Sequence, residues 1–161
     1  MTIYWLDSSV LIESEKGMYA RELVPKFWDF LSTNLDNGTI RLPSACYEEI
    51  VAGNDDVAKW CKLRKNSGFF CVRPSREVQD IYARVAEWTV ANNKPHVAQE
   101  FLRGADGWLI AHAIATPNAC AVTEELRNKN TAKLKIPTVA KHHKLRCLAT
   151  HEMCRALQAR F

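Results

Sequence analysis

Short apolar runs alternate along this chain with longer segments in which apolar residues recur at every third or fourth position. The short runs are bounded by turn-forming residues such as Asn, Gly and Pro, which is typical of buried strands. The strands that this pattern predicts are Ile3–Leu6, Ile40–Leu42, Phe69–Val72, Ala119–Thr123 and Leu145–Leu148.

The longer segments have the period of helices that bury one side. The expected helices lie around Val10–Ile12, over Ala20–Leu35, from Pro43 to Gly53, over Val57–Leu63, Val78–Val90 and Gly107–Ala115, near Pro137, and from His151 onward. Parallel strands need crossover connections, so strands that alternate with helices predict an α/β fold. We expect three α/β/α layers around a central parallel sheet of about five strands.

The composition fits one globular domain that covers residues 1–161. Of the 161 residues, 47% are hydrophobic and 25% are charged, a balance that excludes disordered and membrane-embedded chains. The longest nearly apolar stretch, Trp108–Ala115, is interrupted by His112 and is too short to span a bilayer. Residues 1–7 lack the basic and apolar regions of a signal peptide, so we expect a cytoplasmic protein without membrane contact.

Positive charge is concentrated at the end of the sequence. Residues 126–161 hold nine Lys or Arg and one acidic residue, whereas residues 1–125 hold 13 basic and 17 acidic residues. This basic final quarter suits a polyanion or an acidic protein partner, although a solvated surface has the same composition. Because phosphate contacts need positive charge, a nucleic acid is expected to approach from one side.

The six cysteines are expected to be reduced and buried, because most of them lie in apolar runs. A zinc site is the alternative for one group near the end of the sequence, which consists of His142, His143, Cys147, His151 and Cys154. The group has no Cys-x₂-Cys or His-x₃-His pair beside Cys147, so core and surface positions are the favoured interpretation.

Acidic residues stand near the predicted strand ends at four places. Asp7 ends the first strand, Glu48 or Glu49 lies in the helix after the second, Asp106 opens a helix before the fourth, and Glu125 follows the fourth. Pockets of parallel α/β sheets form outside the carboxyl ends of the strands, so all four acids can reach one rim. Each also has a structural interpretation, as a helix cap (Asp7, Asp106) or an exposed charge (Glu49, Glu125).

Helical geometry places Asp106 but does not choose between the two glutamates. At 100° per residue, Asp106 lies on the side of Leu109 and Ile110, the face that must cover the sheet. Glu48 and Glu49 each lie about 130° from the centre of the apolar arc of their helix. Both therefore stay open as the second acid.

Converging carboxylates repel one another unless they take up protons or share a cation. Hard oxygen ligands select Mg²⁺ or Mn²⁺. Beside a basic flank, such a centre suits metal-assisted hydrolysis of a phosphodiester, in which the metal activates water and Lys and Arg hold the flanking phosphates. The sequence has no serine-hydrolase, dinucleotide-binding or P-loop signature, and Ser9 stands where a haloacid dehalogenase has a second Asp.

Four stretches, in this order, resemble the PIN-domain family, and in particular the bacterial PIN-like proteins related to VapC-type toxins. The stretches are Tyr4–Ile12, Pro43–Ile50, Ala105–Ala113 and Ala121–Glu125. The resemblance implies that Asp7, Glu49 and Asp106 bind Mg²⁺ or Mn²⁺. It places Glu125, one methylene longer than the family's usual Asp, at the fourth acidic position.

The same resemblance implies a metal-dependent endoribonuclease, often homodimeric and inhibited by a small antitoxin protein. Ser9 and Thr123 match polar positions near the site and are expected either to bind there through water or to cap the ends of elements. From the basic flank, the residues expected to bind RNA are Arg127, Lys129, Lys133 and Lys135.

Two other functions stay open. One is a non-catalytic RNA- or protein-binding module that uses the basic surface from Arg127 to Arg146, and the other is a structure-specific DNA nuclease. Trp108 and His112, four residues apart on their helix, form either a partner surface or, slightly favoured, a packing contact under a neighbouring helix. Glu100 and Glu124 are expected to be surface acids.

Overall fold

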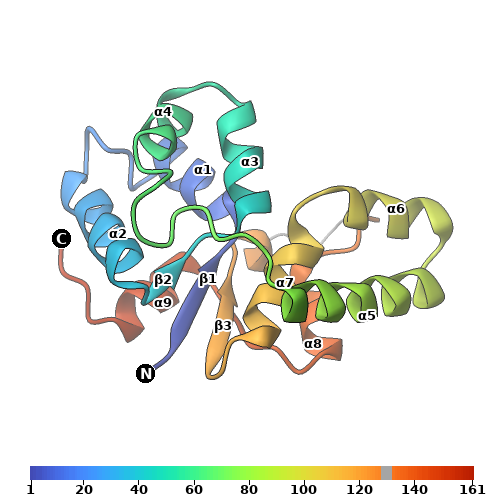
Figure 1. The fold of residues 1–161 in the computed structure, drawn as a ribbon. Coiled ribbons are helices and arrows are strands. Elements are labelled where there is room, and N and C mark those ends of the chain that lie inside the picture. Colours follow the sequence, from blue (N-terminus) through green and yellow to red (C-terminus); the bar gives the residue numbers. More distant parts are fainter. Residues whose placement is uncertain (128–131) are drawn as a thin grey trace.

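The computed structural model describes residues 1–127 and 132–161. A parallel sheet with the strand order β2-β1-β3-β4 lies at its centre (Figure 1). The strands are β1 (Ile3–Leu6), β2 (Ile40–Arg41), β3 (Ala119–Val122) and β4 (Cys147–Leu148). Every strand pair is parallel, so the carboxyl ends of all four strands lie at the same edge of the sheet.

The helices largely follow the apolar periodicity of the sequence. They are α1 (Ser8–Lys16), α2 (Pro25–Asn37), α3 (Ser44–Ala52), α4 (Asp56–Lys62), α5 (Arg76–Asn92), α6 (Pro95–Arg103), α7 (Asp106–Ala115), the 3-10 helix η1 (Glu125–Arg127), α8 (Ile136–His142) and α9 (Thr150–Ala156). α2 begins at Pro25, later than expected, because proline favours the first helical position. The sequence pattern does not predict α6, which also begins at a proline, Pro95.

Helices cover both faces of the sheet. All four residues of β1 are buried, and successive side chains of a strand point to opposite faces, so both faces must be covered. On one face, the rings of Trp5 and His112 of α7 lie 4.6 Å apart. α5 packs along the outside of α7, whereas α2 packs beside β2 at the other side of the molecule (Figure 1). The predicted three-layer α/β class is therefore confirmed.

Phe69–Val72 does not form the predicted strand, so the described part of the sheet has four strands instead of five. The segment still runs beside the chain after β2, where the Leu42 N–H donates to the Phe69 carbonyl and the Val72 N–H to the Leu42 carbonyl, both at 2.9 Å. The Ser44 N–H also donates to the Val72 carbonyl at 2.8 Å, yet the pairing amounts to one isolated parallel bridge between Pro43 and Val72. No ladder with β2 develops, because the Phe70 N–H donates to the Ser67 carbonyl in its own turn and α3 begins at Ser44.

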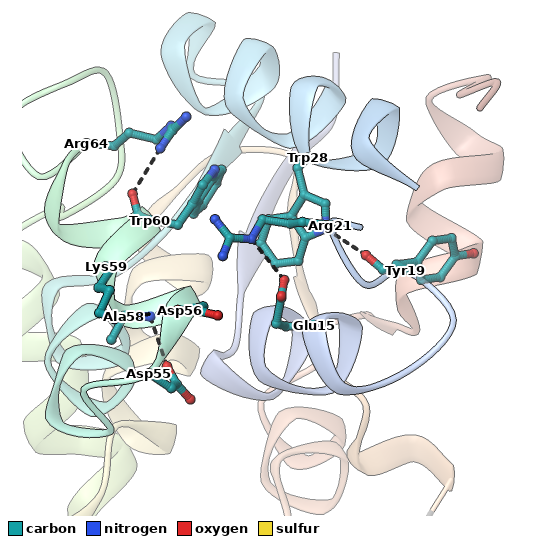
Figure 2. Close-up of polar contacts among 10 residues, drawn as sticks. All are labelled: Glu15, Tyr19, Arg21, Trp28, Asp55, Asp56, Ala58, Lys59, Trp60 and Arg64. Atoms are coloured by element: carbon teal, nitrogen blue, oxygen red, sulfur yellow. Dashed lines mark hydrogen bonds and ion pairs between the residues drawn. The ribbon is translucent and has the colours of Figure 1, made fainter. Parts of the chain in front are cut away.

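Aromatic rings and the polar groups around them hold the helices of the N-terminal half together (Figure 2). Trp28 Nε1 donates to the Tyr19 carbonyl at 2.6 Å, and the Trp28 ring meets the Trp60 ring edge to face at 5.0 Å. Arg21 pairs with Glu15 at 3.1 Å and lies over the Trp28 ring. These contacts connect α1, α2 and α4.

Trp108 packs against a neighbouring helix, as the favoured interpretation expects, whereas His112 packs against the sheet. The Trp108 ring stacks on the Tyr82 ring of α5 at 3.8 Å, and His112 lies against Trp5 of β1. All six cysteines are free thiols, four of them buried. In the part of the chain that the structure describes, no helix combines the length and apolarity that a membrane crossing needs.

Candidate active site

Asp7 lies at the carboxyl end of β1 with only 3% of its surface exposed. It holds the N-cap position of α1, but its side chain accepts no hydrogen bond from the helix backbone, so the cap interpretation is wrong for the carboxylate. The carboxylate instead accepts hydroxyl hydrogen bonds from Ser9 at 2.5 Å and Thr123 at 3.0 Å. Burial, together with the negative charges of Glu125 and Glu49, raises its pKa to about 6, against the lowering effect of these two hydroxyls.

Asp106 is the first residue of α7 and faces the same region. Burial raises its pKa to about 8, and the charges of Asp7, Glu125 and Glu49 contribute in that order, while Lys135 lowers it. Its side chain makes no cap bond to its own helix. The charges of Glu49 and Glu125 thus act on both Asp7 and Asp106, so the four acids predicted from the sequence lie near one another.

Glu49, not Glu48, belongs to this group. Its Oε2 accepts a hydrogen bond from the Ser8 hydroxyl at 2.7 Å, and its Oε1 accepts one from the Ala105 N–H at 2.9 Å, directly before Asp106. Glu48 lines a separate pocket on the other side of α3. Tertiary contacts with α1 and α7 thus settle the choice that the helix geometry leaves open.

Glu124 and Glu125 follow β3 and hold the beginnings of two later helices. Glu125 Oε2 accepts the Ile136 N–H at 2.9 Å, at the start of α8. Glu124 accepts the N–H and the hydroxyl of Thr150, at the start of α9. The expectation of an exposed Glu124 is therefore wrong, because its carboxylate satisfies a helix terminus.

Ser9 and Thr123 both contact Asp7 and lie beside each other. Their hydroxyl oxygens lie 3.5 Å apart, and Thr123 Oγ1 also accepts the Glu125 N–H at 3.1 Å. Ser9 Oγ accepts the Glu124 N–H at 3.2 Å. The two hydroxyls therefore join Asp7 to the chain that carries Glu125.

Two further residues of the site are not singled out by the sequence pattern. Ser8 contacts Asp7 and Glu49, yet in the sequence it looks like an ordinary capping residue between Asp7 and Ser9. Cys46 is fully buried, and burial with the charges of Asp7, Glu49 and Asp106 raises the pKa of its thiol well above the ordinary value. In the sequence, the apolar residues near Cys46 indicate only a cysteine of the hydrophobic core.

A pocket of about 720 Å³ adjoins the carboxylates. Its lining includes Ser9, Glu125, Lys135, Thr150 and His151. Of the predicted RNA-binding residues, Lys135 thus reaches the site.

The remaining predicted RNA-binding residues are Arg127, Lys129 and Lys133. Lys133 is exposed and pairs with Glu100 at 3.1 Å. Arg127 ends η1. Lys129 lies outside the described residues.

The donor set suits a hard divalent cation. Asp7, Glu49, Asp106 and Glu125 offer only oxygen, and no ion pair joins any of them to a basic side chain within residues 1–127 and 132–161. Over the same ranges, no three His, Cys, Asp or Glu side chains are already arranged to hold a metal ion. Binding would therefore require carboxylate side chains to rotate toward one another.

The model of a family described as a domain of unknown function (DUF4411) matches residues 4–161. No curated protein matches the chain.

Proposed function

The chain belongs to the DUF4411 family, and we propose that it is a Mg²⁺- or Mn²⁺-dependent endoribonuclease whose centre consists of Asp7, Glu49, Asp106 and Glu125. A metal centre of this kind would explain why four acidic residues share one rim of the sheet, and the PIN-like order of the sequence motifs agrees with it.

The observation that carries the proposal is the convergence of these four acids, none of which forms an ion pair with a basic side chain of the described residues. They lie at the end of β1, on α3 and at the starts of α7 and η1, and burial, with the charges of the neighbouring acids, raises the pKa of Asp7 to about 6 and of Asp106 to about 8. Asp7 is buried, and a buried carboxylate is normally paired with a positive charge, since an unpaired buried charge is unfavourable. Charged groups that destabilise the folded state in this way are typical of functional sites.

The surrounding residues orient the acids. The hydroxyls of Ser9 and Thr123 donate to Asp7. The Ser8 hydroxyl and the Ala105 N–H donate to Glu49. Asp7 and Glu49 are therefore each held by residues of two different segments. When bound, a divalent metal would supply a nucleophilic hydroxide from water near neutral pH and stabilise the leaving oxygen of a phosphodiester.

RNA is the substrate class that the basic flank supports. Lys135 lies beside Asp106 and lines the adjoining pocket, where its ammonium can contact a phosphate next to the reacting one. His151 lines the same pocket. A cationic group such as Lys135 increases the local concentration of a polyanion and fixes its position.

Cleavage of single-stranded RNA in the presence of Mn²⁺ tests the proposal. We expect Asp7→Asn and Asp106→Asn to lower the rate by at least about 100-fold, because each removes a charged metal ligand. Asp29→Asn, which changes an exposed acid of α2, serves as the matched control and should cleave at the parental rate. Equal activity of all four purified proteins would refute the ribonuclease.

The same preparations separate the ribonuclease from the two other functions. Salt-sensitive RNA binding without Mn²⁺ dependence and without cleavage would identify a non-catalytic module instead. Cleavage of branched DNA but not of RNA, lost in the Asp106→Asn variant, would identify a structure-specific DNA nuclease with the same centre.

We extend the proposal, on the PIN-like resemblance alone, to the toxin of a toxin–antitoxin pair that acts in the cytoplasm, forms a homodimer and binds a small antitoxin. Expression in a bacterial host should then arrest growth, and Asp106→Asn should relieve the arrest at equal protein level. Arrest that persists in this variant would contradict the toxin role.

A further inference from the structure

A second pocket, of about 430 Å³, lies between α3, α7 and the chain that leads to α5. In Figure 1 this chain passes the end of α3 before it enters α5 beside α7. The pocket is lined by Ser44, Ala45, Glu48, Lys65, Cys71, Arg73, Pro74, Trp108 and His112. None of the four acids of the proposed metal centre is among these residues, so the pocket is a separate feature.

His112 presents a polar group to this pocket from a buried position. The residue is 3% exposed, and its ring nitrogens have no hydrogen-bond partner among the described residues. In the described ranges, the polar side-chain atom that is both fully buried and without a partner is Nε2 of His143. The unpartnered ring nitrogens of His112 are therefore not fully buried. The imidazole edge of His112 therefore opens into the pocket that it lines, where a ligand can satisfy it.

Two cations stand at the mouth of the pocket. Lys65 and Arg73 are exposed, and neither forms an ion pair with a carboxylate of the described residues. Lys65 Nζ lies 5.6 Å from the centre of the Tyr47 ring, which restricts where the ammonium group sits. Against one acid, Glu48, the lining has two positive charges and favours an anion.

An aromatic plane forms another part of the wall. The Trp108 ring stacks on Tyr82 with an interplanar angle of 9°. Gly107 allows this close contact, because a Cβ there would lie 2.9 Å from the Tyr82 ring. The ring is thus held in place while part of it lines the pocket, as in sites that stack planar ligands.

We propose that this pocket binds a nucleotide, with its phosphate at Lys65 and Arg73 and its base against Trp108 and His112. The volume lies within the usual range for small-molecule sites. Burial lowers the pKa of His112 to about 4, so near neutral pH its ring offers one donor and one acceptor, which match the mixed edge of a base. The proposal is independent of the nuclease assignment.

The nucleotide can come from two sources with the same chemistry, a free mononucleotide or an unpaired nucleotide of an RNA strand. Calorimetry with AMP, GMP, CMP, UMP, inorganic phosphate and a single-stranded tetranucleotide, all with EDTA to remove metal, distinguishes them. We expect at least one mononucleotide to bind with a Kd below roughly 1 mM. Tighter binding of the tetranucleotide would identify RNA as the source, and weaker binding the free nucleotide.

Variants of the exposed cations provide the main control. Lys65→Ala combined with Arg73→Ala should weaken nucleotide binding at least tenfold. Lys26→Ala combined with Arg155→Ala removes the same charge from exposed positions of α2 and α9 and should leave binding unchanged. His112→Gln should weaken nucleotide binding but not phosphate binding, and thermal unfolding of each variant reports whether it is folded.

Three results would overturn the proposal. The first is no saturable binding of any mononucleotide. The second is binding that the Lys65/Arg73 double variant does not weaken, or that phosphate alone reproduces at the same affinity. The third is binding that is lost in Asp106→Asn but retained in the double variant, which would place the ligand at the carboxylates instead.

Discussion

The Ser8 hydroxyl donates a 2.7 Å hydrogen bond to Glu49 Oε2 and thereby connects the first turn of α1 to α3. The other oxygen of Glu49 accepts the N–H of Ala105, at the start of α7. Glu49, a residue of α3, is therefore bonded to α1 through Ser8 and to the start of α7 through Ala105. We expect the position of the Glu49 side chain to depend on Ser8, because the Ser8 hydroxyl, directly after Asp7 in the sequence, donates to one of its two oxygens.

We expect Ser8→Ala to weaken Mn²⁺ binding roughly tenfold, as loss of a group that orients a metal ligand usually does. Calorimetric titration with Mn²⁺ measures the change, and Ser8→Thr, which keeps the hydroxyl, should restore most of the affinity. Ser32→Ala on α2 is the matched control, because this serine lies on a helix away from the acids. If Ser8→Ala and Ser32→Ala bind Mn²⁺ equally well, Ser8 does not position Glu49.

Metal affinity should increase with pH. In the metal-free protein the pKa of Asp106 is raised to about 8 and that of Asp7 to about 6, and a cation must displace the protons that these groups hold. Between pH 6 and 8 we expect up to about a tenfold gain in Mn²⁺ affinity per pH unit, with little further gain above pH 8.

Calorimetry in buffers of different ionisation enthalpy counts the protons released. About one proton should leave per metal near pH 7, and fewer at pH 9. A Kd that stays constant from pH 6 to 8 would contradict metal binding at Asp106.

The stability of the metal-free protein should change in the opposite direction. Because the pKa of Asp106 is higher in the folded than in the unfolded state, the folded state holds more protons between about pH 4 and pH 8, and stability falls as the pH rises through this range. Asp106→Asn removes the charge and should raise the free energy of unfolding at pH 8 by on the order of 2 kcal/mol.

Urea unfolding in EDTA at pH 4 and pH 8 measures this difference. Near pH 4 the variant and the parent should differ little, because Asp106 is then mostly protonated in the folded protein. Asp29→Asn should show no comparable change between the two pH values. A destabilised Asp106→Asn variant at pH 8 would mean that the carboxylate supports the fold.

Asp55 caps α4, and this contact can be tested away from the site. Its carboxylate accepts the Ala58 N–H at 3.0 Å (Figure 2). Asp55→Ala should lower the free energy of unfolding by about 1 kcal/mol, as loss of an N-cap does. Asp56→Ala, which breaks only an exposed pair with Lys59, should cost less than about 0.5 kcal/mol. Equal urea midpoints for the two variants would contradict the cap.

The sequence pattern predicts the fold class and the approximate position of the acids for physical reasons. Buried parallel strands are short and apolar, and the residue that ends such a strand lies at the edge where pockets form. Asp7 could therefore be placed from its position after Leu6 alone. Asp106 could be placed because it shares a helix face with Leu109 and Ile110, both buried.

Contacts between elements decide what the pattern does not. Glu48 and Glu49 are equivalent on their own helix, and only Ser8 and Ala105, distant in the sequence, select Glu49. Glu124 looks exposed until α9 comes beside it and Thr150 donates to its carboxylate. These assignments depend on tertiary structure and not on local periodicity.

The failed strand has a local cause that the apolar pattern hides. Phe69–Val72 is as apolar as β1, but the Phe70 N–H donates to the Ser67 carbonyl and the neighbouring chain enters α3 at Ser44, directly after the bridge at Pro43. A short apolar run therefore indicates burial, whereas the paths of the two neighbouring chains decide whether a ladder forms.

The order β2-β1-β3-β4 also affects how the protein is made. β1 lies in the interior of the sheet, and Asp7 at its end bonds to Thr123, 116 residues later. At the usual speed of about 5–20 residues per second, a ribosome needs on the order of ten seconds to supply that partner. Throughout this delay the apolar Ile3–Leu6 segment has an unpaired edge, so nascent chains of this protein should depend on chaperones until β3 has emerged.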